Sequence, residues 1–532
     1  MRYLKKQREG DMMEKTVSKC IPGKTALGNP FMEPWERIPD GEPRVFTDPA
    51  TGEKRMYVYG SHDTMDERFC GYDHVVWSAP ADDLTRWRHD GVAFHINQLD
   101  GLTFTPENGT QLTFHPGKEC LYAPDVVYHP QRNTYLMFVF TSETQHMFAA
   151  ESDRPEGPYT NPRYIGPGFD PAVLVDDEKD ANGNQRIYLY WSVESERSAY
   201  ACELDPVTLK KIDGTLHVPI GHSSAADGND TMPYRELAPF YFFEGPSIRK
   251  VGDFYVLSYA KTDDAPGYGN LAQIGYAYSD NPYGDPGMGS AWQFGGTIID
   301  NRGEVIRDPY SSEPVATYKG GNNHGGMIDV DGQWYQIYHR WTGVGPTRQA
   351  MAEAISLRIE GDRLLIDQAE VTSQGFRKDG LNPYESQYAT SACFGLGSYI
   401  FDVNPAQDFA PDSVREDRYP VTDLRNHSWL GYKYFDFGEG IREGEQLYLT
   451  LFLRDCAAAA INIYAAEPKE SYCALEQPRT RIGTAALDGT NAWREVAVPV
   501  SSLGGRQAIY LEFCSDAEGA VCELDKLRFI AE

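Results

Sequence analysis

Short apolar stretches centred on tyrosine recur through the first two thirds of the chain. Each follows a turn that contains Gly or Asn, and the stretches span residues 55–59, 134–138, 187–190, 254–257 and 334–338. Helical periodicity is nearly absent between them, so the pattern favours strands. Each unit has room for about four short strands, and a four-stranded sheet repeated radially is a propeller blade. The repeat predicts a five-bladed β-propeller within residues 28–375.

The hydrophobic pattern changes after a polar connection at residues 361–383. Apolar and polar positions alternate in 446–452 and 508–513, and a further strand is expected at 522–529. Alternation over short strands is typical of a β-sandwich. We therefore expect an all-β protein with an N-terminal extension (1–27), the propeller (28–375) and a β-sandwich (jelly-roll) domain (384–532).

Composition and charge narrow the class of ligand. The chain has 34 Tyr, 50 Gly and 34 Pro, which suits short strands and many turns. Its formal net charge is −29, and a field of that sign repels nucleic acid and anionic membrane surfaces. No run of about 20 apolar residues occurs. We expect a neutral ligand, with neither a nucleic acid nor a membrane as partner.

The cysteines and the N-terminal residues indicate the cellular compartment in which the protein is expected. Nine cysteines are scattered without a CxxC pair, which argues against a disulfide framework. Residues 1–20 contain basic residues but no apolar run, so they do not read as a Sec-type signal peptide. Both observations predict a cytoplasmic protein.

Ionisable residues recur 10 to 18 positions before the repeated tyrosines, each followed by a short apolar stretch. In chain order they are Asp40 and Glu42, Asp125, Asp170, Glu244 and His324. If the first strand of each blade lines the axis, these side chains converge on one end of the central channel. Any one of them alone could equally be an acid at a strand edge or turn, but equivalent positions in five units weaken that alternative.

Glu244 lies between two phenylalanines, Phe242 and Phe243, and a Gly-Pro turn. Apolar neighbours disfavour the charged form of a carboxyl and raise its pKa, and a protonated carboxyl can act as a general acid. An acid and an ionised base on opposite sides of a pocket are what glycoside hydrolysis requires. We expect Glu244 to be the acid, an acid near the N-terminus to be the base, and Asp170 to orient the acid and keep it protonated.

Four motifs in this order resemble glycoside hydrolase family 43. They are Asn29-Pro30 ahead of Ile38-Pro-Asp40, Tyr122-Ala-Pro-Asp125, Gly168-Phe-Asp-Pro171 and Glu244-Gly-Pro246. The resemblance implies a five-bladed propeller and hydrolysis with inversion of β-xylosides, α-L-arabinofuranosides, arabinans or galactans. It also implies a base near the N-terminus, a modulator at Asp170 and an acid at Glu244.

The identity of the base stays open between two residues. Pro39-Asp40 keeps the Pro-Asp order, whereas Glu42-Pro43 matches Asp170-Pro171 in the internal repeat. We expect Asp40 to be the base and Glu42 to contact substrate or water.

Further substrate contacts are expected from Asp125, Phe169, His324 and Arg348. Arg348 matches an arginine that the family often carries near the sugar, although a salt-bridge role is an alternative. Phe169 can stack on a sugar ring, although core packing is the commoner fate of such a residue.

Metal sites are expected only from the resemblance to known families. His324 resembles the channel histidine of the family, which often lies beside calcium or sodium. The C-terminal domain resembles a family 6 carbohydrate-binding module, which implies a structural calcium held by Glu385 and Asp525. No HExxH, paired-Cys or EF-hand pattern supports a catalytic metal, so no cofactor is expected for the chemistry.

These features favour an inverting, exo-acting α-L-arabinofuranosidase or β-xylosidase that acts on side chains or ends of a plant-type oligo- or polysaccharide. The alternatives are a galactan- or arabinan-specific enzyme of the same family and a propeller that binds carbohydrate without turnover.

Overall fold

A computed structural model describes residues 28–64, 68–193, 198–220, 240–262, 272–283, 292–403, 418–472 and 478–532. Nearly all regular structure in these ranges is β, so the all-β prediction is confirmed. Two short 3₁₀ helices are described, η2 (Ile96–Leu99) and η6 (Ala389–Ser391). No helix in the described ranges is long and apolar enough to cross a bilayer.

Four antiparallel sheets of four strands follow one another along the chain. Sheet 1 contains β1 (Glu42–Thr47), β2 (Lys54–Tyr59), β3 (Asp73–Pro80) and β4 (Arg88–His95). Sheet 2 contains β7 (Leu121–His129), β8 (Thr134–Thr141), β9 (His146–Ser152) and β10 (Thr160–Pro167). Sheet 3 contains β11 (Phe169–Lys179), β12 (Gln185–Val193), β13 (Ser198–Leu204) and β14 (His217–Ile220). Sheet 4 contains β15 (Phe242–Val251), β16 (Phe254–Lys261), β17 (Gln273–Ser279) and β18 (Gln293–Asp300).

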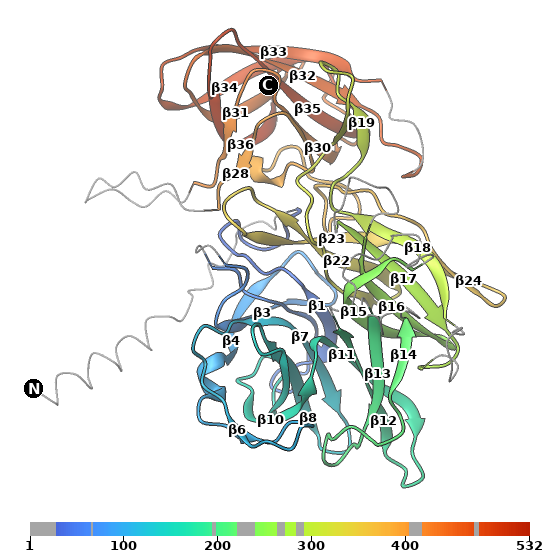
Figure 1. The fold of residues 1–532 in the computed structure, drawn as a ribbon. Coiled ribbons are helices and arrows are strands. Elements are labelled where there is room, and N and C mark those ends of the chain that lie inside the picture. Colours follow the sequence, from blue (N-terminus) through green and yellow to red (C-terminus); the bar gives the residue numbers. More distant parts are fainter. Residues whose placement is uncertain are drawn as a thin grey trace, which may run out of the picture.

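Sheet 5 completes the series with the three strands β21 (Met327–Val330), β22 (Gln333–Trp341) and β23 (Arg348–Ile355). The first strands of the five sheets contact one another in a closed order: β1 with β7, β7 with β11, β11 with β15, β15 with β21, and β21 with β1. Figure 1 shows β1, β7, β11 and β15 close together in the interior of this part of the molecule. The N-terminal ends of the first strands therefore face a common space.

The repeated tyrosines all lie on the second strand of their sheets. Tyr57, Tyr135, Tyr188, Tyr255 and Tyr335 belong to β2, β8, β12, β16 and β22. All five are at most 7% exposed, because each second strand is covered on both faces by neighbouring sheets. The tyrosine-centred sequence pattern thus identified the second strand of each of the five sheets.

Three two-stranded hairpins connect or extend these sheets. They are β5 (Thr103–Phe104) with β6 (Leu112–Thr113), β19 (Val305–Arg307) with β20 (Pro314–Ala316), and β24 (Leu357–Glu360) with β25 (Arg363–Ile366).

The C-terminal region forms two more sheets. One has the order β28 (Ile400–Phe401), β29 (Val421–Leu424), β36 (Cys522–Ala531), β31 (Leu447–Asp455) and β34 (Trp493–Val500), with β26 (Gln387–Tyr388) also paired to β36. The other has the order β27 (Phe394–Leu396), β30 (Trp429–Asp436), β35 (Arg506–Cys514), β32 (Ala458–Ala466) and β33 (Thr480–Asp488). Apolar side chains of β31 and β36 in the first sheet and of β32 and β35 in the second belong to one core, so the two sheets face each other.

The same core continues into sheets 4 and 5. Val256 of β16 and Met351 of β23 belong to the cluster that contains Leu451 of β31. The connection predicted as polar is part of it too, since Leu364 and Leu381 are fully buried. Hydrogen bonds cross this boundary as well: Arg340 donates to the hydroxyl of Tyr318 (2.6 Å), which in turn donates to the carbonyl oxygen of residue 392 (2.8 Å). The C-terminal sheets are thus fused to the first five rather than tethered by a linker.

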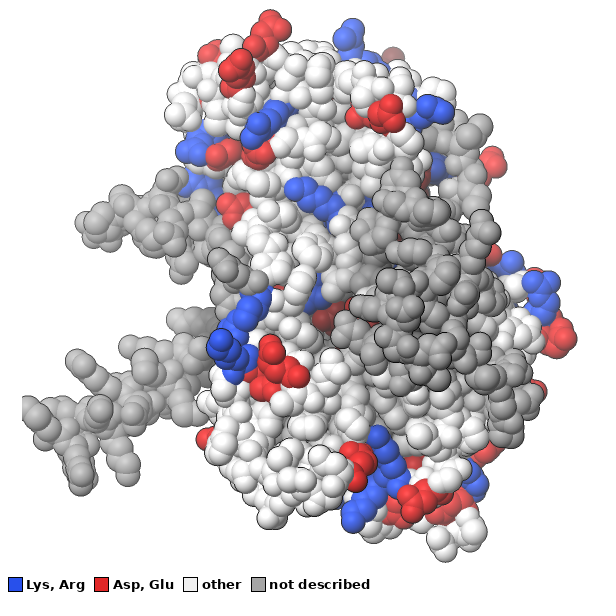
Figure 2. Space-filling view, viewed as in Figure 1, with Lys and Arg blue, Asp and Glu red and all other residues white. Residues whose placement is uncertain are grey.

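Surface charge and thiols complete the description. On the face shown in Figure 2, acidic and basic side chains of the described residues are interspersed among uncharged ones. Within the described ranges the seven cysteines are all free: Cys70, Cys120, Cys202, Cys393, Cys456, Cys514 and Cys522. The expected absence of nucleic-acid and membrane partners and the cytoplasmic location stay predictions.

Candidate active site

Three carboxylates occupy equivalent places at the ends of first strands. Asp40 lies two residues before β1, Asp170 is the second residue of β11, and Glu244 is the third residue of β15. Since first strands contact one another around a ring, these ends are brought together. All three line one cavity of about 220 Å³. Its other lining residues are Phe69, Cys70, Tyr122, Phe140, Ser142, Gln145, Phe169, Asn322, His324 and Arg348.

The backbone is strained at this cavity. Asp40 and Asp170 have φ values of +57° and +52°, in the left-handed region that non-glycine residues rarely adopt. Gly245, beside the third carboxylate, has φ +63°. Such conformations cost free energy and cluster at functional sites, because they aim side chains where regular strands would not.

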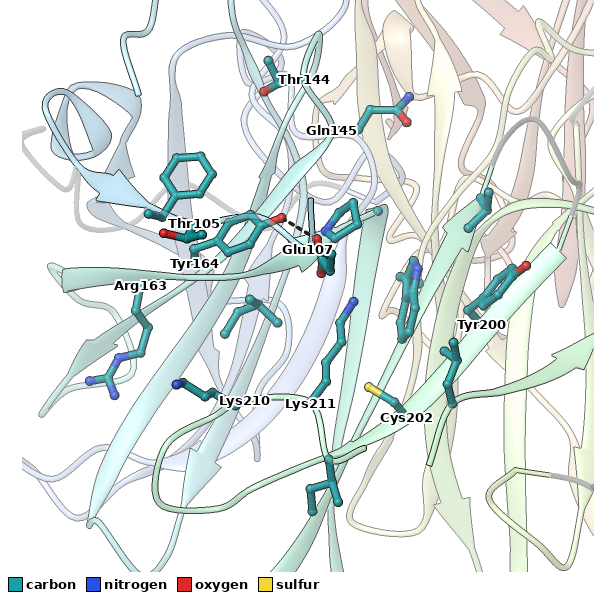
Figure 3. Close-up of a pocket in the computed structure, with 18 of the residues that line it drawn as sticks. Thr105, Glu107, Thr144, Gln145, Arg163, Tyr164, Tyr200, Cys202, Lys210 and Lys211 are labelled. Carbon is teal, nitrogen blue, oxygen red and sulfur yellow. Dashed lines mark hydrogen bonds between the residues drawn. The ribbon is translucent and has the colours of Figure 1, made fainter. Parts of the chain in front are cut away.

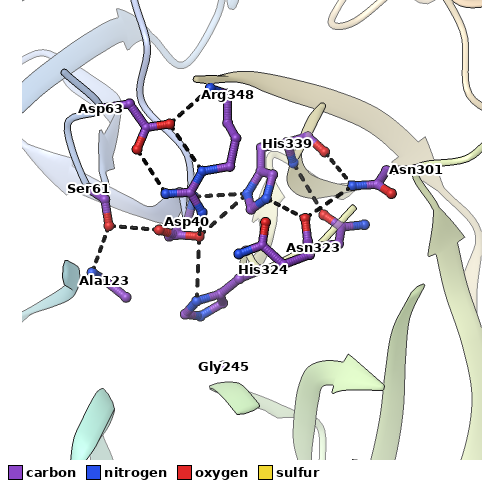
Figure 4. Close-up of polar contacts among 12 residues, drawn as sticks. Asp40, Ser61, Asp63, Ala123, Gly245, Asn301, Asn323, His324, His339 and Arg348 are labelled. Atoms are coloured by element: carbon purple, nitrogen blue, oxygen red, sulfur yellow. Dashed lines mark hydrogen bonds and ion pairs between the residues drawn. The ribbon is translucent and has the colours of Figure 1, made fainter. Parts of the chain in front are cut away.

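Asp40 is buried but surrounded by groups that favour its ionised form (Figure 4). Arg348 Nη1 donates to Asp40 Oδ1 (3.2 Å), and the hydroxyl of Ser61 donates to Oδ2 (2.7 Å). That hydroxyl also accepts from the N–H of Ala123 (2.8 Å), which fixes its proton toward Asp40. Burial alone raises the pKa of a carboxyl, but the charge of Arg348 and the hydrogen bond from Ser61 outweigh it and lower the pKa of Asp40 below its ordinary value. Asp40 is therefore equipped to act as a base.

His339 holds the main chain of Asp40 in place. The N–H of Asp40 donates to His339 Nδ1 (3.2 Å), and Nε2 lies 2.6 Å from the carbonyl oxygen of Asn322. Nδ1 must accept, so the proton is on Nε2 and the ring is neutral. Burial, followed by the charge of Arg348, lowers the pKa of His339 to about 3, which agrees with a neutral ring. Asn301 and Asn323 bond the backbone of the same histidine, so a layer of uncharged polar groups supports the base (Figure 4).

Arg348 is fixed by a second carboxylate. Its Nε and Nη2 donate to Asp63 (3.0 and 2.8 Å), and its own backbone N–H donates to Asp63 as well (2.9 Å). Nη2 also lies 3.3 Å from the sulfur of Cys70. Burial lowers the pKa of a guanidinium, but Asp40 and Asp63 outweigh it and raise the pKa of Arg348. The predicted contact of Arg348 with substrate stays a prediction, although the side chain does line the cavity.

Asp170, Glu244 and His324 meet around Gly245. The backbone N–H of Gly245 donates to Asp170 Oδ2 (3.0 Å), so Asp170 orients the segment that carries Glu244. A Cβ at Gly245 would lie 2.8 Å from the ring of His324, so only glycine permits this approach. His324 Nδ1 lies 4.0 Å from Asp40 Oδ1, and burial lowers the pKa of His324. The histidine thus lies between the Asp40 side and the Glu244 side of the cavity.

Two predicted contact residues lie outside the cavity. Glu42 pairs with Arg249 (2.5 Å) and accepts a hydrogen bond from Ser247 (3.0 Å). Asp125 accepts two hydrogen bonds from Arg44 Nη2 (both 2.7 Å). These buried pairs form a second charged layer behind the cavity, because first strands carry inward-facing charges that must be paired. Neither residue lines the cavity, and the expectation that Glu42 and Asp125 contact substrate stays a prediction.

The metal sites implied by resemblance stay predictions. No group of three or more His, Cys, Asp or Glu side chains suited to a metal occurs in the described part of the chain. Glu385 pairs with Arg377 (3.2 Å) and lies before β26, whose residue Gln387 is paired with Leu527. The joint calcium site of Glu385 and Asp525 stays a prediction.

Sequence reasoning missed several residues that build the site. Ser61, Asp63 and His339 follow or end second strands, and Ser142 follows β8. Second strands run antiparallel to first strands, so their C-terminal ends lie at the same end as Asp40, Asp170 and Glu244. Polar residues directly after the tyrosine-centred stretches were therefore a usable signal.

The site joins an ionised carboxylate (Asp40), a second carboxyl group on another strand (Glu244) and a third carboxylate (Asp170) that binds the main chain next to Glu244. This is the equipment for general acid–base hydrolysis of a glycosidic bond. Comparison with known proteins agrees. The profile described as Glycosyl hydrolases family 43 matches residues 53–361.

Curated relatives support the same assignment. The chain is 31% identical to a xylosidase/arabinosidase of Thermoclostridium stercorarium, over 77% of this chain and 82% of the relative. It is 24% identical to an arabinoxylan arabinofuranohydrolase of Paenibacillus polymyxa, over 96% and 75%. Among solved structures, a family 43 arabinoxylan arabinofuranohydrolase from Bacillus subtilis in complex with cellotetraose gives a TM-score of 0.46 at 18% identity, over 95% and 97% of the two chains.

The chain is a glycoside hydrolase that acts on a saccharide substrate. It belongs to glycosyl hydrolase family 43.

Proposed function

We propose that this enzyme is an inverting, exo-acting α-L-arabinofuranosidase or β-xylosidase that removes side chains or terminal sugars from a plant-type xylan or its oligosaccharides. One observation carries the proposal: Asp40, buried yet held in its ionised form, lines the same small cavity as Glu244. A cavity of about 220 Å³ is smaller than usual ligand pockets, which suits a single sugar ring. The names of the curated relatives point to arabinose and xylose.

The proposed roles follow from the contacts. Asp40 removes a proton from the attacking water, and Glu244 protonates the departing glycosidic oxygen. Asp170 positions Glu244 through the N–H of Gly245 and keeps a negative charge near it. These steps use only side chains of the protein and require no metal ion. A structural calcium in the C-terminal domain is a separate proposal, which metal analysis of the purified protein tests.

The architecture that carries these roles is a five-bladed propeller with sheets 1 to 5 as its blades, over residues 28–375. The closed order of contacts among first strands supports this assignment. Residues 384–532 then form a β-sandwich of the carbohydrate-binding-module type, supported by the shared core of its two sheets. Trp429 and Trp493 are poor candidates for sugar binding there, because Trp429 is 8% exposed and stacks on Tyr464, and Trp493 stacks on Phe452.

The test is a panel of nitrophenyl glycosides with arabinofuranose, xylose and galactose, assayed with the wild type, Glu244→Gln and Asp170→Asn. We expect turnover of the arabinofuranoside or xyloside and a large loss in both variants, with less loss in Glu244→Gln for nitrophenol than for a sugar leaving group, because nitrophenol departs without a proton. Proton NMR of the first product formed distinguishes inversion from retention. Preference for galactoside, or an anomer of retained configuration, would contradict the proposal.

A further inference from the structure

A second and larger cavity lies beside the catalytic one, between sheets 2 and 3. It has a volume of about 1240 Å³, and we call it the lateral groove. Its walls come from β10, β12, β13, the β5–β6 hairpin and the connection between β13 and β14 (Figure 3). None of the residues assigned to catalysis above lines it.

The lateral groove and the catalytic cavity share a border. Gln145, in the turn between β8 and β9, lines both cavities. Its carbonyl oxygen accepts a hydrogen bond from the N–H of Gly168 (2.9 Å), and the two residues after Gly168, Phe169 and Asp170, line the catalytic cavity. A ligand that extends past Gln145 can therefore occupy both spaces.

The walls of the groove offer aromatic faces. Tyr164 stacks on Phe104 with ring centroids 4.5 Å apart, and Tyr200 stacks on Trp191 at 5.7 Å. In each pair the buried ring supports a partly exposed tyrosine. Trp191 is fixed further by Gly168, where a Cβ would lie 2.3 Å from the indole. Rigid aromatic rings with a polar edge suit ligands that have both apolar faces and hydroxyl groups.

The polar groups in the groove are hydroxyls, an amide and charges of both signs. Thr103, Thr105 and Thr144 are exposed there. Lys211 Nζ lies 4.2 Å from the centroid of the Trp191 ring and is attracted electrostatically to Glu107. The hydroxyl of Tyr164 donates to Glu107 as well (3.3 Å). Arg163, Lys210 and Asp213 also line the groove, so it carries charges of both signs, and its hydroxyl, amide and charged groups can donate and accept hydrogen bonds.

We propose that the lateral groove binds a stretch of the neutral xylan main chain while the catalytic cavity holds the sugar to be removed. The volume of the groove, its tyrosine faces and its border with the catalytic cavity at Gln145 favour a chain of sugar rings over a single small molecule. This inference rests on the proposed function for the identity of the glycan.

The test uses two groove variants and one matched control on the full chain. Thr105→Trp fills the groove, and Tyr200→Ala removes one aromatic face. Val92→Trp on β4 is the control, since Val92 is 49% exposed and lines neither cavity. Calorimetry measures binding of a linear, unsubstituted xylo-oligosaccharide, and kinetics compares kcat/KM for arabinoxylan with kcat/KM for the best nitrophenyl glycoside.

We expect Thr105→Trp and Tyr200→Ala to weaken oligosaccharide binding by about threefold to tenfold and to lower kcat/KM for arabinoxylan by a similar factor. Turnover of the small aryl glycoside stays at the wild-type value in both, and Val92→Trp changes neither quantity. Equal effects on long and short substrates, or no binding of the oligosaccharide by the wild type, would overturn the proposal. Oligosaccharide binding that the groove variants abolish, in an enzyme that turns over none of the aryl arabinofuranosides or xylosides, would support the groove and contradict the proposed sugar specificity instead.

Discussion

The guanidinium of Arg348 connects two carboxylates, with Nη1 3.2 Å from Asp40 and Nη2 2.8 Å from Asp63. Asp63 accepts hydrogen bonds from one side of the guanidinium, and Asp40 accepts one from the other side. Because all three groups are buried, the charge on Arg348 acts on Asp40 with little screening by water. The ionised state of the proposed base therefore depends on an arginine from sheet 5.

Replacing Arg348 should shift the pH dependence of catalysis. Without the guanidinium the pKa of Asp40 rises, so the acidic limb of kcat/KM moves to higher pH. The contribution of Asp40 to stability has the same sign: it is present above the ordinary carboxyl pKa and is lost as pH falls through the lowered value. We expect the shift in Arg348→Met and a smaller one in Arg348→Lys, which keeps a charge.

Folding of these variants is monitored by thermal unfolding. Breaking a buried pair costs about 3–5 kcal/mol, so Arg348→Met will be less stable than the wild type. An unchanged acidic limb in a folded Arg348→Lys and Arg348→Met would show that Asp40 is not the titrating base.

Asp40→Asn and Glu42→Gln separate the two candidates for the base. Asn tolerates the left-handed backbone at position 40 and leaves Arg348 paired with Asp63, so Asp40→Asn should fold while kcat/KM falls about 10²–10⁴-fold. Glu42→Gln leaves Arg249 without its carboxylate partner, so it should lose about 3–5 kcal/mol of stability and keep most of its activity per folded molecule. The opposite outcome, an active Asp40→Asn and a folded but inactive Glu42→Gln, would assign the base to Glu42.

Gly245→Ala tests the contact between the acid-bearing strand and His324. The methyl group would meet the imidazole at 2.8 Å and would also strain a residue with φ +63°. Gly438→Ala is the control for strain alone, because Gly438 has φ +55° and no atom within 4 Å of an added Cβ. We expect both variants to lose about 1 kcal/mol or more of stability.

Activity should separate the two glycine variants. Gly245→Ala should also lose kcat, because the Asp170–Gly245 hydrogen bond and His324 are both displaced, whereas Gly438→Ala should retain it. Equal kcat values in the two variants would contradict a role for Gly245 in positioning the site residues.

His62 gives the protein a pH-dependent stability. Burial lowers the pKa of an imidazole, but Asp73 (2.8 Å) and Glu36 (3.4 Å) outweigh it and raise the pKa of His62 to about 10. A raised histidine pKa contributes stability that is fully present below pH 6.5 and lost as pH rises toward 10. The difference in Tm between the wild type and His62→Gln should therefore be largest near pH 6.5 and close by about pH 10. A gap that widens with pH would contradict the charged pair.

The sequence predicted the β class, the second strands and the three carboxylates of the cavity, because these depend on local patterns. Tyr57 and its four counterparts mark strands through alternation and turns, which act over a few residues. Asp40, Asp170 and Glu244 could be grouped because they lie at equivalent positions of the repeated sheets, and equivalent positions in a radial repeat lie around the same axis. His324 was grouped correctly for the same reason.

What the sequence could not predict concerns partners supplied by distant segments. Glu42 and Asp125 occupy the same repeated positions as cavity residues, but Arg249 and Arg44 neutralise them behind the cavity. Whether a carboxylate lines the cavity or pairs with a buried arginine depends on side chains from distant segments. No local pattern in the sequence predicts those contacts.

The uninterrupted apolar core that joins β16 and β23 to β31 has a practical consequence for engineering. Truncation near residue 375 would expose a hydrophobic surface to solvent. The remaining fragment would then be prone to aggregate. The C-terminal sheets thus cannot be exchanged independently, and any chimera of this enzyme has to carry them together with sheets 1 to 5.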